Sequence, residues 1–134
     1  MYSVNKMTPL LKRLDHIEYI VKDVNAFVDF MKMFGFEIVR ETDHHHGSAE
    51  IKLPGDDLII EVHKVEGDEN PGINHIGWYA TEKEIYKIPE KLKEKNIEHR
   101  GPRFFEPTGR ILLNFRDPDG FRAQIIAIPE KTQE

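Results

Sequence analysis

The amino-acid sequence predicts an α+β fold made of two βαβββ modules. The same order of elements, a strand, a helix and three strands, occurs on both sides of a turn near the middle of the chain. Residues near the start and the end of each half also match, which indicates an internal repeat. We assign residues 14–66 to the first module and 73–128 to the second, together as one domain. Residues 1–13 and 129–134 are predicted to be flexible ends.

The first module opens with a strand over Leu14–Val21, which is rich in Ile, Tyr and Val. Asp23 is a helix N-cap, and Gly35 is a stop signal after the helix. Between them, apolar residues recur at helical spacing: Val24, Phe27, Val28, Met31 and Phe34. Three strands follow this helix, and we place them at Phe36–Thr42, Ser48–Leu53 and Leu58–Val65.

The second module follows a turn at Gly67–Gly72, which contains Pro and Gly but no apolar anchor. Its first strand is predicted at Ile73–Ala80. Thr81–Glu84 forms a capping box that opens a helix reaching about Lys95, and Pro89 is expected to kink that helix or split it. The last three strands are predicted at Ile97–Arg100, Arg110–Phe115 and Phe121–Ile128.

The repeat rests on two pairs of segments that align in chain order. They are Leu14–Ile17 with Ile73–Ile76, and Leu58–Val62 with Phe121–Ile125. The first pair places His16 on His75, and the second places Glu61 on Gln124. The chemically distinctive residues of the two halves therefore occupy equivalent positions.

Alternation along the strands sorts these residues onto two faces of the sheet. One face is almost wholly apolar and is expected to pack under the helices: Ile17, Tyr19, Val21, Leu58, Ile60, Val62, Ile76, Trp78, Ala80, Phe121, Ala123 and Ile125. The other face carries most of the polar residues: His16, Glu18, Glu61, His63, His75, Tyr79, Asn114, Arg122 and Gln124. Burying so many polar groups is costly unless they are satisfied, so we expect a polar cleft on this face.

Length and composition exclude several classes of protein. A chain of 134 residues with 39 % hydrophobic residues can bury a core and fold as one domain. No apolar run approaches the roughly 20 residues that span a bilayer. Met1–Arg13 lacks the apolar core of a signal peptide. We therefore expect a cytoplasmic protein that does not associate with membranes.

Charge and cysteine content narrow the chemistry further. The formal net charge is −5, and the signs are interspersed, so the chain lacks the basic surface typical of nucleic-acid binding. There is no Cys, which excludes disulfides, thiolate metal sites and a cysteine nucleophile. A transition-metal site would have to use His, Asp, Glu or Gln.

The run His44-His45-His46 invites a metal-site interpretation. Consecutive residues on a strand point to alternate faces, so these three side chains cannot all converge on one ion. We interpret the run as a solvated turn between two strands.

Four motifs resemble the vicinal oxygen chelate superfamily, which includes glyoxalase I, bleomycin-resistance proteins, methylmalonyl-CoA epimerases and extradiol dioxygenases. The motifs are Leu14–Ile17, Leu58–Val62, Asn74–Gly77 and the Asp-Pro-Asp-Gly turn Asp117–Gly120. The resemblance extends from about Leu14 to Ile128. It implies two βαβββ modules with curved mixed sheets around a metal-binding cleft, and a homodimer.

By position in these motifs, the resemblance implies four metal ligands: His16, Glu61, His75 and Gln124. Most catalytic members have Glu where this chain has Gln124. An amide oxygen can coordinate a cation but cannot accept a proton near neutral pH. This change leaves Glu61 as the candidate catalytic base, with Glu18 and His63 as alternatives. The remaining polar residues of the face are predicted to bind substrate: Glu18, His63, Tyr79, Asn114 and Arg122.

The resulting hypothesis is a metal-dependent isomerase or lyase of the glyoxalase type, acting on a small substrate with adjacent oxygens through a metal-stabilised enolate. One divalent transition metal, Ni, Co, Zn, Mn or Fe, is expected per site. One alternative is a ferrous-iron dioxygenase that uses His16, His75 and Glu61. The other is a non-catalytic protein that sequesters a small molecule, which the loss of a carboxylate at Gln124 favours.

Overall fold

The computed structural model describes residues 9–44 and 47–130. The first half contains β1 (Arg13–Val21), α1 (Val24–Lys32), β2 (Glu37–Thr42), β3 (Ser48–Lys52) and β4 (Ile59–Lys64). The second half contains β5 (Gly72–Tyr79), α2 (Glu82–Ile85), α3 (Ile88–Glu94), β6 (His99–Phe105), β7 (Arg110–Arg116) and β8 (Arg122–Ala127). The predicted order of elements, and with it the α+β class, is confirmed.

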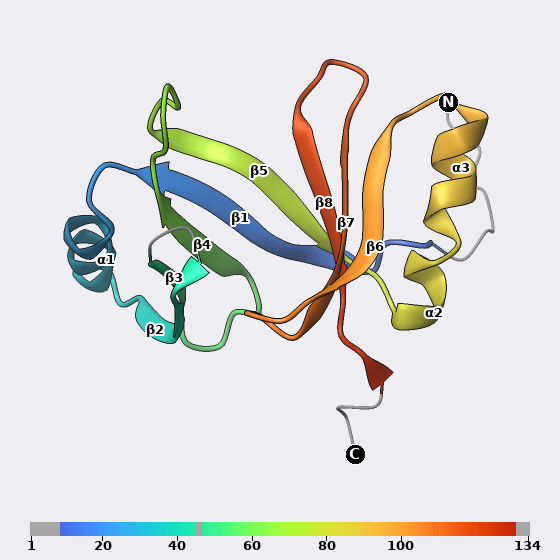
Figure 1. Ribbon diagram of the computed structural model, residues 1–134. Coiled ribbons are helices and arrows are strands. Elements are labelled where there is room, and N and C mark those ends of the chain that lie inside the picture. The colour runs from blue at the N-terminus through green and yellow to red at the C-terminus, as the bar shows by residue number, and fades with distance from the viewer. Residues whose placement is uncertain (1–8, 45–46, 131–134) are drawn as a thin grey trace, which may run out of the picture.

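All the strands join one curved, eight-stranded mixed sheet in the order β2-β3-β4-β1-β5-β8-β7-β6 (Figure 1). β1 runs parallel to β4 and β5 runs parallel to β8, while β1 and β5 meet antiparallel at the centre. In this central pair Ile17 lies opposite Ile76. An approximate two-fold axis through that pair relates the halves, so His16 and His75 occupy equivalent places on either side of it.

Two hydrophobic cores lie at opposite ends of the sheet, each under its own helical segment (Figure 1). The Asp23 side chain caps α1 by accepting a hydrogen bond of 3.0 Å from the Ala26 amide. Under α1 the core consists of Val21, Val28, Ala49, Ile51, Ile60 and Val62. Under α2 and α3 it consists of Ala80, Ile85, Ile88, Leu92, Ile111, Leu113, Ile125 and Ala127. Apolar strand faces on the helix side are thus confirmed for both halves.

The predicted helix of the second half is split in two, as Pro89 led us to expect. Pro89 stands in the first turn of α3, where its missing N–H donor costs no helical hydrogen bond. The capping box is also present: Thr81 Oγ1 accepts from the Glu84 amide at 3.2 Å and donates to Glu84 Oε1 at 2.8 Å.

Replacing Thr81 by alanine is expected to lower the free energy of unfolding by about 1 kcal/mol, because the cap of α2 is lost. Urea denaturation followed by circular dichroism measures this change. Lys91→Ala, at an exposed position of α3, is the matched control and should change stability by less than about 0.5 kcal/mol. Equal effects of the two substitutions would contradict a capping role.

The predicted helix-side face is wrong at three residues. Ile76, Trp78 and Phe121 were expected beneath the helices but are 40 %, 37 % and 71 % exposed. Each helical segment covers its own end of the sheet and leaves the middle of β5 uncovered.

The strand predicted at Ile97–Arg100 instead spans His99–Phe105. Gly101 and Pro102 look like a strand end in the sequence, but a bulge between Arg100 and Arg103 accommodates them, and pairing with β7 continues beyond it. Gly101 is needed there, since a Cβ atom would lie 2.4 Å from the Leu112 carbonyl oxygen.

Part of the predicted flexible N-terminal end is ordered. Leu10 and Leu11 pack against the second core, and the Lys12 amide donates a 2.8 Å hydrogen bond to the Tyr79 carbonyl. Residues 1–8 and 131–134 lie outside the described residues. Among the described helices, none has the length and apolar character needed to cross a membrane.

Candidate metal centre

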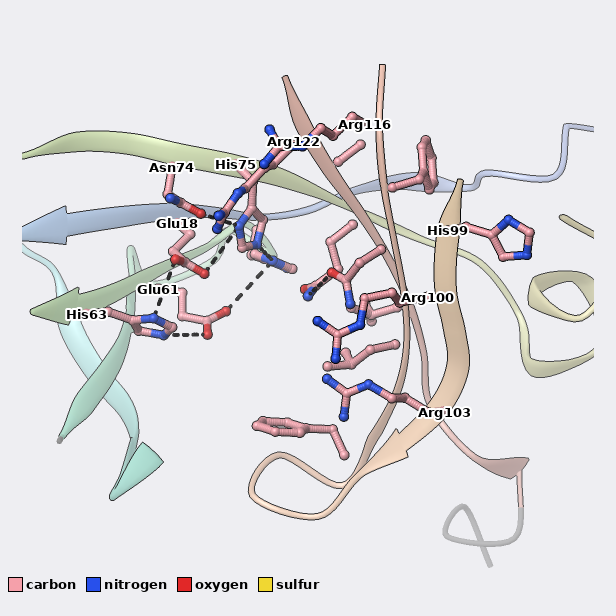
Figure 2. A pocket seen from close by; sticks show the side chains of 18 of the residues that line it. Glu18, Glu61, His63, Asn74, His75, His99, Arg100, Arg103, Arg116 and Arg122 are labelled. Atoms are coloured by element: carbon pink, nitrogen blue, oxygen red, sulfur yellow. Dashed lines mark hydrogen bonds and ion pairs between the residues drawn. The ribbon is translucent and has the colours of Figure 1, made fainter. Parts of the chain in front are cut away.

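The concave face of the sheet forms a cleft with a volume of about 1430 Å³. On one wall, β1, β4 and β5 contribute the histidine and glutamate side chains, as Figure 2 shows for Glu18, Glu61, His63 and His75. On the facing wall, Arg100 and Arg103 of β6 extend toward them. The cleft therefore has a metal-capable wall and a basic wall.

His16 of β1 is 1 % exposed and has a fixed orientation. Its Nδ1 donates a 2.7 Å hydrogen bond to Asp15 Oδ2, which leaves Nε2 directed into the cleft. A break in the β1–β5 register between Leu14 and His16 allows neighbouring residues to interact despite strand alternation. A carboxylate that holds the outer nitrogen of a histidine is the usual support of a metal-ligating imidazole.

Gly77 of β5 makes room for the His16 ring. It lies opposite His16 in the β1–β5 pair, and a Cβ atom at this position would stand 1.9 Å from His16 Cε1. The position must therefore lack a side chain for the imidazole to lie flat against the strand.

His75 of β5 is held in a similar way. Its Nδ1 lies 2.9 Å from Asn74 Oδ1 and 3.3 Å from Glu18 Oε2. Its Nε2 faces His16 Nε2 at 3.2 Å. With both Nδ1 atoms occupied by oxygen acceptors, the two Nε2 lone pairs converge on one point, and a divalent cation there would satisfy both. The donor set fits the metal that the sequence predicted.

Glu61 of β4 lies at the centre of the polar wall. Its Oε2 is 3.8 Å from His16 Nε2, and its Oε1 is 2.8 Å from His63 Nε2 and 3.7 Å from His44 Nε2. The two carboxylate oxygens of Glu61 thus lie closest to different histidines. No other described carboxylate contacts three imidazoles.

Burial and charge shift several pKa values at this wall. Burial would raise the pKa of Glu61, but the His44 and His63 contacts and the charge of His16 hold it well below 4.5. Burial raises the pKa of Glu18 to about 7, against the opposing charge of His63. Burial and the charge of His16 lower the pKa of His75 to about 4.

The other two histidines shift in the opposite direction. Burial would lower the pKa of His16, but the Asp15 hydrogen bond and the charge of Glu61 outweigh it and raise the value. For His63, burial is likewise outweighed by the Glu61 hydrogen bond and the charge of Glu18, and the pKa is raised. The shifts of this wall therefore run in both directions: the pKa of His75 is lowered, and the pKa values of His16, His63 and Glu18 are raised.

This pattern predicts the pH dependence of cation uptake by the metal-free protein. Groups whose pKa is raised retain protons that a cation must displace, so affinity is expected to fall as the pH drops below about 7, the pKa of Glu18. At pH 6 cation binding should release more protons than at pH 8. Calorimetry in buffers of different ionisation enthalpy measures the proton count, and equal release at both pH values would contradict the expectation.

The solvated-turn interpretation of the histidine run is wrong for its first member. His44 follows β2, its side chain is 11 % exposed, and its Nε2 faces Glu61. Thr42 Oγ1 is hydrogen-bonded to His44 Nδ1 and lies 2.6 Å from Ser48 Oγ, so the β2–β3 hairpin directs the ring inward. His45 and His46 lie outside the described residues. His44 lies two positions after Thr42 and continues the alternation of β2. This alternation was the signal in the sequence that could have placed the His44 side chain in the cleft.

The remaining predicted site residues are spread around the cleft. Gln124, Asn114 and Arg122 line it together with Glu18 and His63. The Gln124 amide nitrogen donates a 2.9 Å hydrogen bond to Asn114 Oδ1, which turns the carbonyl oxygen away from that contact. Four-residue coordination that includes Gln124 stays a prediction.

Tyr79 does not line the cleft, contrary to expectation. It sits at the end of β5 opposite Arg13, whose guanidinium carbon lies 4.9 Å from the centre of its ring.

Sequence reasoning missed a buried charged group below the histidines. Arg110 of β7 lies 3.4 Å from Asp15 Oδ2 and 3.8 Å from Glu50 Oε1, and so connects the two halves. Glu50 is 2 % exposed, Arg40 is its other basic neighbour, and burial raises its pKa. Glu50 lies opposite Glu61 in the β3–β4 pair, and Arg110 of the second half reaches Glu50 only in the folded sheet.

Comparison with known proteins supports this picture. A family model described as Glyoxalase/Bleomycin resistance protein/Dioxygenase superfamily matches residues 13–125. Among curated proteins, none matches the chain significantly by sequence.

Several solved structures share the fold. Methylmalonyl-CoA epimerase from Mycobacterium tuberculosis has a TM-score of 0.78 at 16 % identity, and the match covers 95 % of each chain. A variant of the Streptomyces coelicolor epimerase in complex with 2-nitronate-propionyl-CoA has a TM-score of 0.72 at 17 % identity, covering 88 % of this chain and 98 % of that one. Homoprotocatechuate 2,3-dioxygenase from Brevibacterium fuscum has a TM-score of 0.70 at 25 % identity, covering 87 % of this chain and 33 % of that one.

Proposed function

We propose that this chain, which belongs to the glyoxalase/bleomycin resistance protein/dioxygenase superfamily, is a metal-dependent isomerase. Its substrate is a small anionic molecule in which an oxygen pair flanks an acidic C–H bond. The proposal rests on the two walls of the cleft that face each other. One wall carries the metal-capable side chains of β1, β4 and β5, and the other carries guanidinium groups of β6 and β8.

His16 and His75 supply the two imidazoles that would hold the cation, and Glu61 supplies the carboxylate. When bound, a divalent cation supplies Lewis-acid stabilisation of negative charge on a substrate oxygen. Arg103 and Arg122, which point into the cleft from β6 and β8, bind the anionic part of the substrate. Charge on both walls fixes the orientation of the substrate between them.

Glu18 is the group best suited to move the proton. A base works best when its pKa lies near the working pH, and burial raises the pKa of Glu18 to about 7, whereas that of Glu61 is held well below 4.5. Glu18 lines the cleft, and its Oε1 lies 3.4 Å from His63 Nδ1. The proposal therefore moves the role of base from Glu61 to Glu18.

The test is deuterium exchange at the carbon next to the carbonyl. Metal-loaded protein is incubated in D₂O with α-hydroxy-carbonyl compounds, hemithioacetals and 2-substituted acyl thioesters, and exchange is followed by NMR. Glu18→Gln is expected to slow exchange by about 10²- to 10⁴-fold, while Arg103→Met should mainly raise KM. Glu98→Gln, an exposed carboxylate lining the same cleft, is the control. Absence of exchange with every class of compound would remove the isomerase proposal.

One observation favours a second candidate, a ferrous-iron dioxygenase. Two imidazoles and one carboxylate, His16, His75 and Glu61, are the donor set of non-haem iron oxygenases, and the dioxygenase neighbour is 25 % identical. Iron-dependent oxygen uptake with catechols would support this candidate, and no uptake would exclude it for those substrates.

Our proposal includes assembly as a homodimer. The partly exposed Ile76 and Trp78, with Phe121 at 71 % exposure, form an apolar strip that neither helical segment covers. Burial of this strip against a second copy would remove it from water. A sedimentation mass near 15.7 kDa at micromolar concentration would contradict the dimer.

A further inference from the structure

We infer that the cleft binds two divalent cations, which share Glu61 as a bridging ligand. One cation takes His16 and His75. The other takes His44 and His63, which nothing in the proposed function uses as metal ligands. The inference goes beyond the proposed isomerase and does not depend on which reaction occurs.

The second site is the more compact of the two. Within residues 9–44 and 47–130, His44, Glu61 and His63 form the group whose ligand atoms all lie within 4.8 Å of one another. Their nitrogen and oxygen donors match the preferences of Mn²⁺, Fe²⁺, Co²⁺ and Zn²⁺. The group draws on β4 and on the β2–β3 hairpin, whereas the first pair comes from β1 and β5. Separate elements therefore build the two halves of the centre.

Glu61 joins the groups because its two oxygens point to different histidines. Oε2 is nearest to His16, at 3.8 Å from Nε2, while Oε1 is 2.8 Å from His63 Nε2 and 3.7 Å from His44 Nε2. Because the two groups of histidines face different oxygens of the carboxylate, each oxygen can serve its own cation. Cations bridged in this way stand about 3.5–4 Å apart.

Each of the two new ligands has its outer nitrogen supported by an oxygen. Thr42 Oγ1 is hydrogen-bonded to His44 Nδ1, and Glu18 Oε1 lies 3.4 Å from His63 Nδ1. In the metal-free protein His63 Nε2 donates to Glu61. Cation binding displaces that proton, and a proton retained on Nδ1 then faces Glu18. This support is the same kind that Asp15 gives to His16.

The charge of the wall also favours cation binding. Four carboxyl groups are buried there: Asp15, Glu18, Glu50 and Glu61. Arg110 and neighbouring arginines pair with Asp15 and Glu50. Within the described part of the chain, the ion-pair partners of Glu18 and Glu61 are histidines. Cations bound among the four imidazoles would compensate the buried negative charge of these two carboxylates.

The experiment measures Mn²⁺ stoichiometry and magnetic coupling in the full chain. Mn²⁺ is chosen because it binds weakest in the divalent series, so adventitious binding to surface histidines is smallest. After chelation, Mn²⁺ is restored by equilibrium dialysis, counted by mass spectrometry and examined by electron paramagnetic resonance. The wild type is expected to hold two ions per chain with an exchange-coupled spectrum.

His44→Ala is the decisive variant, because its side chain lies on a hairpin outside both cores and its loss should leave the fold intact. It is expected to hold one ion with the spectrum of isolated Mn²⁺. Two controls should keep both ions. One is His99→Ala on β6, and the other is His45→Ala with His46→Ala, which removes the rest of the histidine run.

Saturation of the wild type at one ion would overturn the inference, and so would two ions without magnetic coupling. Loss of the second ion in the His45 and His46 double variant, with retention in His44→Ala, would assign it to the wrong histidines and would also overturn it. The outcome is independent of the isomerase proposal. One ion with deuterium exchange removes the second site alone, while two coupled ions without exchange remove the isomerase alone.

Discussion

Replacing Glu61 by alanine is expected to lower the affinity for divalent cations by more than about 100-fold. Loss of an outer-shell partner already costs 10- to 100-fold at metal sites, and Glu61 supplies a ligand rather than a support. Because its oxygens face His16 on one side and His63 on the other, both groups of histidines lose their carboxylate. Equilibrium dialysis and calorimetry with Mn²⁺ measure the change.

Glu98→Ala is the matched control for this substitution. Glu98 lines the same cleft but is exposed and lies just before β6, so its removal changes net charge equally and leaves the polar wall intact. Its Kd for Mn²⁺ should stay within a few-fold of the wild type. Similar losses in both variants would mean that cations are attracted by the overall charge of the cleft, and the role assigned to Glu61 would be wrong.

Gly77→Ala is expected to destabilise the metal-free protein by about 1–3 kcal/mol and to abolish cation binding at the His16–His75 pair. The added methyl group would stand 1.9 Å from His16 Cε1, and His16 is 1 % exposed, so the ring has little room to move aside. Displacing the ring breaks the Asp15 hydrogen bond and the convergence with His75. Urea denaturation measures the stability, and dialysis measures the metal.

A double-mutant cycle separates this clash from any general effect of alanine in β5. In the His16→Ala background the ring is absent, so adding Gly77→Ala should cost little further free energy of unfolding. A coupling energy near zero would show that Gly77 is tolerant of a side chain, and the steric argument would fail.

Much of the fold was accessible from the sequence because local signals agreed with the tertiary structure. The cap at Asp23, the capping box at Thr81 and the break at Pro89 all act within a few residues of the chain. Strand alternation also placed His16, Glu61 and His75 on one face. Those signals depend on residues that are close in sequence, and the strands of the folded sheet keep the alternation that the sequence predicts.

What could not be predicted depends on contacts between distant segments. His44 reaches Glu61 only because the β2–β3 hairpin turns its ring inward, and Arg110 reaches Asp15 across the two halves of the chain. Trp78 stays partly exposed because the helices cover the ends of the sheet and not its middle. The bulge near Leu14 lets Asp15 contact its neighbour His16, and the bulge near Arg100 lets β6 continue past Gly101 and Pro102.

The approximate two-fold axis through Ile17 and Ile76 pairs each strand residue of the first half with a counterpart in the second half. The pairing follows from strand register. His16 pairs with His75, and four further pairs have a titratable group in the first half only: Glu18 with Gly77, Glu61 with Gln124, Glu50 with Asn114 and His63 with Ile126. At each of these four places the first half carries a titratable group, and the second half carries a neutral one.

Matched halves would offer a substrate two equivalent orientations, related by the axis, and a flat reacting centre would be attacked on either face. The inequality of the halves removes one of those orientations, because the acids lie on one side of the cleft and Arg100 and Arg103 stand opposite. The backbone of the two halves is nearly symmetric, but the side chains that line the cleft are not. We therefore expect a single stereoisomer of the substrate to be bound in the reactive pose.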